Sequence, residues 1–260
     1  TAYGSLSNSS ESTAEVNQIS IPALENSAAM QSEFVIMSKL SLQAFNADSL
    51  SEIERLRKQF SNEQQSYQQA SERLMNAVQE EMTLKAAAGE VNQAYSSFIP
   101  VSTKLFDELK NNLTLRDTID SKLSELEGHA DDMASLILDF TDVRDVQRRF
   151  PRSYQAATSI ETGINTLISN VVDLNRTLSD TTANTISNEI AFRLKDLNDQ
   201  FAVIKTETAG QVSLVSELDE KVSAINESLD GSQGIPALKL KRLQSTADAT
   251  TLLASAEQQT

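Results

Sequence analysis

One stretch of the chain, SIETGINTLISNVVDLNRTL, repeats aliphatic residues at alternating steps of four and three positions. This spacing places all of them on one side of an α-helix, where they form the seam of a helical bundle or coiled coil. The residues of this seam are Ile160, Ile164, Leu167, Val171, Leu174 and Leu178. The pattern therefore predicts a helix that packs lengthwise against other helices.

The same helical period recurs in three other parts of the chain. The stripes consist of Ile119, Leu123, Leu126, Ala130, Met133, Ile137 and Phe140; of Ile53, Leu56, Phe60, Tyr67, Ala70 and Leu74; and of Val215, Leu218, Val222, Ile225 and Leu229. Sustained alternation of apolar and polar residues, which would indicate β-strands, is missing. The sequence therefore predicts an all-α fold.

Turn-forming residues separate these stripes. Ser49 and Ser51 each stand three residues before a glutamate, which is capping-box spacing and predicts the start of a helix. Proline within a helical pattern is expected to kink or end the helix nearby. Further breaks are predicted at the polar or glycine-containing segments 178–187, Gly210 and 229–236, and near Pro100 and Pro151.

Six helices follow from these signals, at about 3–46, 50–84, 88–149, 152–180, 186–208 and 211–260. The sixth is expected to be interrupted near Asp230. Sixty helical residues would extend about 90 Å, too far for one compact globule. We therefore expect an elongated molecule of two stacked four-helix bundles, one formed by residues 1–112 and 236–260 and the other by 113–235. Both chain ends would lie at the same pole.

The composition argues against several classes of function. Acidic residues outnumber basic ones 37 to 22, and the formal net charge of −15 disfavours binding to nucleic acid. Cysteine is absent and His129 is the only histidine, so we expect no metal site, no cofactor and no catalytic triad. The sequence contains neither a membrane-length apolar run nor a signal peptide. It is expected to be soluble throughout, or to be a soluble segment of a longer protein.

The segment VRDVQRRFPRSY concentrates positive charge in this acidic chain. Arg144, Arg148 and Arg152 are four residues apart and would share one face of a continuous helix, while Asp145 is spaced to pair with Arg148 and Arg149. One interpretation is a solvated, partly salt-bridged surface near a helix junction. The other is a site for an anionic ligand or an acidic partner, because guanidinium groups bind carboxylates in a bidentate manner.

Two further residues complete the candidate ligand-binding set of Arg144, Arg148, Arg152, Tyr154 and Arg176. Tyr154 belongs to the same arginine-rich segment. Arg176 lies beside the seam that ends at Leu178, from which it could reach a groove of the bundle. Most residues in such a position simply flank a core, so both readings of Arg176 stay open.

Three segments carry a resemblance to a known family. VNQISIPALENSAAMQSEF is similar to the segment that follows the first membrane span in chemoreceptors and sensor kinases. LDGSQGIPALKLKRLQ resembles the break in the last helix of such domains, and GHADDMASLILDFTDV resembles the distal part of the long third helix in methyl-accepting chemotaxis proteins. With its helix order, the chain resembles the helical bimodular sensor domains of bacterial transmembrane receptors.

The resemblance implies a periplasmic domain of an inner-membrane protein, normally a homodimer, with a transmembrane helix on each side. Such a domain senses a small molecule or a periplasmic binding protein, and it signals by a small displacement of its last helix. The module formed by 1–112 and 236–260 would be membrane-proximal. Family members with carboxylate ligands use arginines on the first helix, whereas this chain has none up to Phe45. The resemblance therefore names no ligand.

Two alternatives stay open beside a chemotaxis receptor. The same domain architecture serves as the input of histidine kinases, and the segment by itself does not contain the output module that would separate the two. A non-sensory helical scaffold or tether would also explain the long apolar seams. The loop at 230–236 is expected to act as a compliant joint if the last helix carries a signal.

Overall fold

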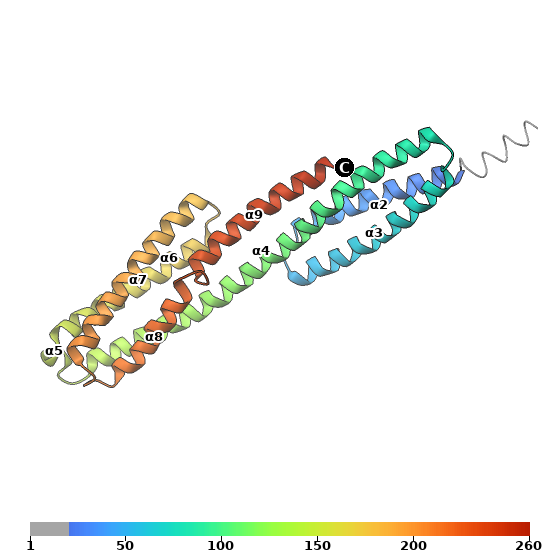
Figure 1. Cartoon of the computed structure of the whole chain (residues 1–260). Helices are drawn as coiled ribbons and strands as arrows, with labels where there is room; N and C mark the ends of the chain where they lie inside the picture. Colours follow the sequence, from blue (N-terminus) through green and yellow to red (C-terminus); the bar gives the residue numbers. More distant parts are fainter. Residues whose placement is uncertain (1–20) are drawn as a thin grey trace, which may run out of the picture. The chain divides into compact units, whose positions relative to one another are not determined.

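A computed structural model describes residues 21–260, which form eight α-helices and no strand (Figure 1). This confirms the predicted all-α fold. The helices are α2 (Ile21–Phe45), α3 (Leu50–Ala77), α4 (Met82–Asp142), α5 (Val146–Arg149), α6 (Pro151–Arg176), α7 (Asp180–Thr208), α8 (Leu214–Leu229) and α9 (Ile235–Gln258).

The predicted number of six helices is not confirmed, for two physical reasons. Asp145 adopts a left-handed conformation with φ 65°, and this separates the four-residue helix α5 from α4. The last predicted helix is two helices, because α8 ends at Leu229 and α9 begins at Ile235. Residues 3–20 of the first predicted helix lie outside the described residues.

Capping residues explain where several helices begin. Ser49 caps α3, as predicted, because its hydroxyl accepts a hydrogen bond from the backbone N–H of Glu52 at 3.2 Å. Ser179 caps α7 in the same way, accepting from Thr182 at 3.3 Å. The predicted turn at 178–187 was therefore too long, since most of that polar segment is the first part of α7.

The proline predictions had different outcomes. Pro151 occupies the first position of α6. A backbone N–H at this position has no partner within the helix, so the N–H that proline lacks costs no helical hydrogen bond. Pro100 lies inside α4, which continues through it for 61 residues in all.

The chain divides into two compact units. Among the described residues, the first comprises 21–113 and 245–260, so it contains α2, α3, the first part of α4 and the end of α9. Its core includes a cluster of aromatic side chains in which Phe34 contacts Phe98 and the rings of Tyr67 and Tyr95 stack at 3.8 Å. The Tyr67 hydroxyl donates a hydrogen bond to Asn92 Oδ1 at 3.1 Å.

This tyrosine pair predicts an alkaline loss of stability in the first unit. Burial raises the pKa of Tyr67 to about 12 from 10.0, and the neighbouring Tyr95 adds to the shift. The folded state thus keeps the proton that the unfolded state releases, so the contribution is full below pH 10 and falls between pH 10 and 12. In urea unfolding measured across this range, we expect Tyr67→Phe to show a shallower fall than the wild type. Tyr154→Phe, in the other unit, should keep the full fall; equal slopes for all three proteins would contradict the assignment.

The second unit comprises residues 114–244, with the second part of α4, helices α5 to α8 and the start of α9. The seam that was read from the sequence forms the buried face of α6 from Ile160 to Leu174. Leu178 does not belong to this core, because α6 ends at Arg176 and the side chain of Leu178 is 91% exposed.

Candidate functional site

The arginine-rich segment lies at the corner where α4 ends and α6 begins, with α5 between them (Figure 1). Arg144 precedes the left-handed residue Asp145, Arg148 belongs to α5, and Arg152 belongs to α6. The chain leaves the helical conformation at Asp145 and at Phe150, so the three arginines do not share one helical face.

Part of the positive charge at this corner is paired within the chain. Arg148 Nη2 lies 3.3 Å from Asp145 Oδ2, which confirms the predicted pair, although the Arg148 side chain is 79% exposed. Exposed pairs of this kind contribute only about 0–1 kcal/mol. Arg149 makes other contacts, because Nη2 donates to Gln211 Oε1 at 2.9 Å and the guanidinium lies 5.0 Å from the Phe150 ring centre.

The N-terminus of α6 already binds a carboxylate of the chain itself. Glu207, in the last turn of α7, accepts hydrogen bonds from the backbone N–H of Ser153 at 2.9 Å and of Arg152 at 3.3 Å. A helix N-terminus attracts anions through its free N–H groups and its dipole. Because Glu207 occupies this position, an external anion would meet only the exposed arginine side chains.

Replacing Glu207 tests this capping contact. We expect Glu207→Ala to lower the free energy of unfolding by about 0.5–2 kcal/mol, the usual effect of losing a side-chain cap. Urea denaturation measures the change. Glu220→Ala, at an exposed position in α8, is the matched control and should change stability by less than about 0.5 kcal/mol. Equal effects of the two substitutions would show that Glu207 does not cap α6.

The structure does not bring all five predicted ligand-binding residues together. Arg152 and half-buried Tyr154 lie in the first turn of α6, whereas Arg176 is its last residue. At 1.5 Å of rise per residue, Arg152 and Arg176 are about 36 Å apart along the helix. Arg176 therefore belongs to a different part of the second unit from the arginine-rich corner.

A buried lysine that the sequence analysis did not single out lies at this other end of α6. Lys239 of α9 is only 2% exposed, and its Nζ donates a hydrogen bond to the carbonyl oxygen of Asn175 at 2.9 Å. Burial lowers the pKa of Lys239, and the charge of Arg242 lowers it further. Because helix C-termini attract cations, Lys239 acts as a capping group that joins α6 to α9.

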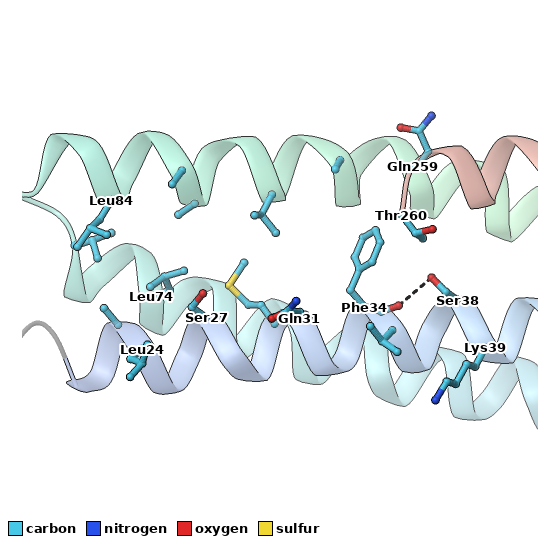
Figure 2. A pocket seen from close by; sticks show the side chains of 18 of the residues that line it. Leu24, Ser27, Gln31, Phe34, Ser38, Lys39, Leu74, Leu84, Gln259 and Thr260 are labelled. Carbon is cyan, nitrogen blue, oxygen red and sulfur yellow. Dashed lines mark hydrogen bonds between the residues drawn. The ribbon is translucent and has the colours of Figure 1, made fainter.

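A cavity of about 1010 Å³ lies in the first unit, between α2 and α4 (Figure 2). We call it the α2–α4 trough. Phe34 projects from α2 toward α4, and Thr260, which follows α9, lies beside it. The lining consists of Ala23, Leu24, Ser27, Met30, Gln31, Phe34, Val35, Ser38, Lys39 and Leu42 from α2, Leu74 and Val78 from α3 and its C-cap, Leu84, Ala87, Ala88, Val91 and Ala94 from α4, and Glu257, Gln259 and Thr260.

The trough is apolar in character. Its charged residues are Lys39 and Glu257, and Lys39 points away from the space between the helices in Figure 2. Leu24 and Val35 on α2 and Val91 on α4 are large apolar side chains that remain exposed. Exposed apolar patches are typical of places where another molecule or chain binds. It is poorly suited to an organic acid.

The sequence analysis missed this surface, although a signal for it exists. Ile21, Ala28, Val35 and Leu42 follow one another at steps of seven in α2.

No protein-family model, curated protein or solved structure matches the chain. Within residues 21–260, no helix has the length and apolar character needed to cross a bilayer. The same residues contain no cluster of three or more side chains arranged to hold a metal ion.

Proposed function

We propose that this chain is the periplasmic ligand-sensing domain of a transmembrane chemotaxis receptor, and that it signals by displacement of its last helix. The resemblance of its sequence to helical bimodular sensors and its all-helical fold support the proposal. Four helical segments contribute to the core of the first unit. We propose that each unit is one of two stacked four-helix bundles.

The observation that carries this proposal is that α9 contributes to the cores of both units. Ile235 and Leu238 are buried in the second unit, and Ala249 and Ala256 are buried in the first. A change in packing around α9 in one unit therefore acts on a helix that the other unit also holds. This is the property that a signalling helix requires.

The two ends of α9 are held unequally. Each buried methylene contributes about 0.8 kcal/mol, so the Ile235 and Leu238 side chains anchor the helix more firmly than the alanines at 249 and 256 do. Ser245, which is also buried, donates a 3.3 Å hydrogen bond from its hydroxyl to the carbonyl oxygen of Glu108, so it holds α9 against α4 where the first unit begins. We propose that α9 is fixed from Ile235 to Ser245 and that its last part, with Ala249 and Ala256, shifts against α2 and α4 in the first unit.

The geometry of the arginine-rich corner favours a protein partner over a small anion as the molecule that binds there. Arg144, Arg148 and Arg152 are exposed, and the backbone donors of α6 are already bound to Glu207. An exposed group of cations matches the acidic face of a partner, such as a periplasmic binding protein, better than it matches a small ligand that needs enclosure. Direct sensing of a small molecule is the second form of the proposal.

A thermal-shift screen of organic acids, amino acids and other small metabolites tests direct sensing. A ligand at 100 times its Kd should stabilise the domain by about 2.7 kcal/mol and raise the melting temperature. If the arginine-rich corner binds it, Arg148→Ala with Arg152→Ala should lower the affinity. Unchanged affinity would refute that location.

Two alternative functions predict different results in these experiments. The sensor domain of a histidine kinase would show the same ligand response, and the output module in the full-length protein decides between the two. A non-sensory scaffold or tether would show no ligand response. Full-length sequence without an apolar span on either side would contradict both sensor proposals.

A further inference from the structure

The α2–α4 trough has an apolar end and a polar end. Three leucines lie at one end of it in Figure 2 and three polar residues at the other, namely Leu24, Leu74 and Leu84 against Ser38, Gln259 and Thr260. From Leu24 to Ser38, helix α2 rises about 21 Å. The lining therefore changes from apolar to polar along the length of one cavity.

The apolar end is suited to a hydrocarbon chain. Leu24 and Leu84 are 73% and 43% exposed, and Val91, further along α4, is 44% exposed. The small side chains of Ala87 and Ala88 line the trough between Leu84 and Val91. Each methylene group that leaves water for such a surface tightens binding by up to about fourfold. A linear chain would therefore bind here with an affinity that grows with its length.

The polar end presents hydrogen-bond acceptors. The Ser38 hydroxyl donates its hydrogen to the carbonyl oxygen of Phe34 at 3.1 Å, and the Thr260 hydroxyl donates to that of Glu257 at 2.7 Å. Each hydroxyl oxygen keeps lone pairs that accept a hydrogen from a ligand. A carboxylate has no hydrogen to donate, and Glu257 itself adds an acid to this end. The polar end therefore favours an uncharged head group that carries hydroxyl groups.

We infer that the α2–α4 trough binds a long-chain amphiphile with an uncharged, hydroxyl-bearing head group, as in an alkyl glycoside or a monoacylglycerol. The chain would lie along the three leucines, and the head group would lie against Ser38, Gln259 and Thr260. Sites for small molecules have volumes of about 300–1,000 Å³ and an apolar lining with a few polar groups that orient the ligand. The trough, at about 1010 Å³, has both properties.

The head group would contact the part of α9 that we propose to shift. Glu257, Gln259 and Thr260 line the trough, and they follow Ala256, which is buried in the core of the first unit. A bound amphiphile would therefore add contacts at the end of α9. The role of the trough as the sensory site rests on the proposed function, whereas the binding of an amphiphile does not.

Isothermal titration calorimetry with hexyl, heptyl, octyl and nonyl glucoside, each below its critical micelle concentration, tests the inference. One molecule should bind per chain, and the affinity should rise by about two- to fourfold with each added methylene. Nonanoate has a similar chain but a carboxylate head, so it should bind at least about tenfold more weakly than nonyl glucoside. An affinity that does not depend on chain length, or equal affinity for nonanoate, would overturn the assigned ligand class.

A charge placed in the apolar end tests the location. Val91→Glu should lower the affinity for nonyl glucoside at least about tenfold, because the chain would meet a buried charge. Leu138→Glu, on an exposed leucine of α4 in the second unit, is the control and should bind as the wild type does. Circular dichroism establishes that each variant is folded, and Leu84→Glu replaces Val91→Glu if that variant is not. Equal affinity of the wild type and a folded trough variant would overturn the inference.

Thiol labelling of the full-length protein tests whether the trough is open there. The 260 residues contain no cysteine, so Val91→Cys supplies the one reactive group of this domain. Mass spectrometry should show that it reacts with a water-soluble maleimide and that nonyl glucoside protects it. An unreactive Val91→Cys would show that a second copy or another segment covers the trough, and it would overturn the inference.

Binding of nonyl glucoside and movement of α9 are measured separately, so failure of this inference is distinguishable from failure of the proposed function. Nonyl glucoside that binds in the trough without changing the distance between spin labels on α9 and α4 would support the site and contradict signalling through α9. Another ligand that shifts α9, and whose affinity Val91→Glu leaves unchanged, would support signalling and overturn the trough as the sensory site.

Discussion

Replacing Gly234 by alanine is expected to lower the free energy of unfolding by about 1–3 kcal/mol or more, the range found when a packed site is overfilled. A Cβ atom at this position would lie 2.5 Å from both the carbonyl carbon and the carbonyl oxygen of Leu229, and 2.8 Å from the carbonyl oxygen of Asp230. These are backbone atoms, so no rotation of a side chain relieves the contact. Urea denaturation with a constant slope measures the loss.

Gly163 provides a matched control, because the same substitution there is expected to change the free energy of unfolding in the opposite direction. It lies inside α6, and a Cβ atom there meets nothing within 4 Å. Gly163→Ala should therefore raise stability by about 0.8–1 kcal/mol, because alanine favours the helical state more than glycine does. A Gly234→Ala variant as stable as the wild type would show that the backbone at the corner between α8 and α9 can shift to accommodate the extra Cβ atom.

The contacts around Gly234 bear on how this corner works. The sequence led us to expect a compliant joint at 230–236. In the structure, Gly231 takes φ 72°, its N–H binds Asp230 Oδ1 at 2.9 Å, and Ile235 is fully buried. We therefore propose that the corner transmits a movement between α8 and α9 and does not absorb it.

Replacing Lys239 by methionine is expected to lower the free energy of unfolding by about 1–3 kcal/mol, the effect of leaving a buried polar group without its hydrogen bond. Methionine retains most of the apolar stem of lysine, so the change removes the contact between Nζ and the Asn175 carbonyl together with the buried charge whose desolvation lowers the pKa of Lys239. The loss is measured near pH 7, where the unfolded lysine is charged, and is the net of these two effects. Hydrogen exchange should also increase in the last turn of α6, since the carbonyl groups there lose their cap.

Lys241 supplies the control for this prediction. It lies two residues further along α9, is exposed, and makes a long contact of 3.4 Å to the Ser232 carbonyl oxygen. Lys241→Met should change stability by less than about 0.5 kcal/mol. Similar effects of the two substitutions would mean that Lys239 acts through net charge and not through the end of α6.

The helical core was predictable because periodicity alone specifies it. Ile160, Ile164 and Leu167 were assigned to a seam, and all three are buried. Leu178 continues the same period but is exposed, because α6 ends before it and Ser179 begins the next helix. An apolar period indicates which face is buried while the helix lasts, but it does not indicate where the helix stops.

The local geometry at the arginine-rich corner was less predictable. Pro151 signalled the start of α6 correctly, since proline suits the first helical position. The left-handed Asp145 carries no such signal, because a non-glycine residue adopts this conformation only where its surroundings favour it. The capping carboxylate of Glu207 lies more than 50 residues away in sequence, and no local pattern indicates its contact with α6.

The remaining features depend on tertiary packing. Lys239 and Lys241 look equivalent in the sequence LKLKRLQ, and only the fold places one of them beneath the end of α6. The seven-residue repeat of Ile21, Ala28, Val35 and Leu42 in α2 is visible in the sequence, but its exposure follows from which face of α2 the first unit buries. The sequence contains both patterns, but only the packing of the helices determines which of these residues are buried and which are exposed.

The distance between spin labels on α9 and α4 within the first unit tests the central claim most directly. Labels at Thr251→Cys and Lys104→Cys, both exposed positions, report on α9 and α4, and the absence of native cysteine makes the labelling specific. The distance is measured by pulsed electron paramagnetic resonance with and without the metabolite that most raises the melting temperature. A sensor that signals through α9 predicts a shift of about 1–2 Å at saturation, the size of typical signalling helix movements. Identical distance distributions with and without the saturating ligand would contradict it.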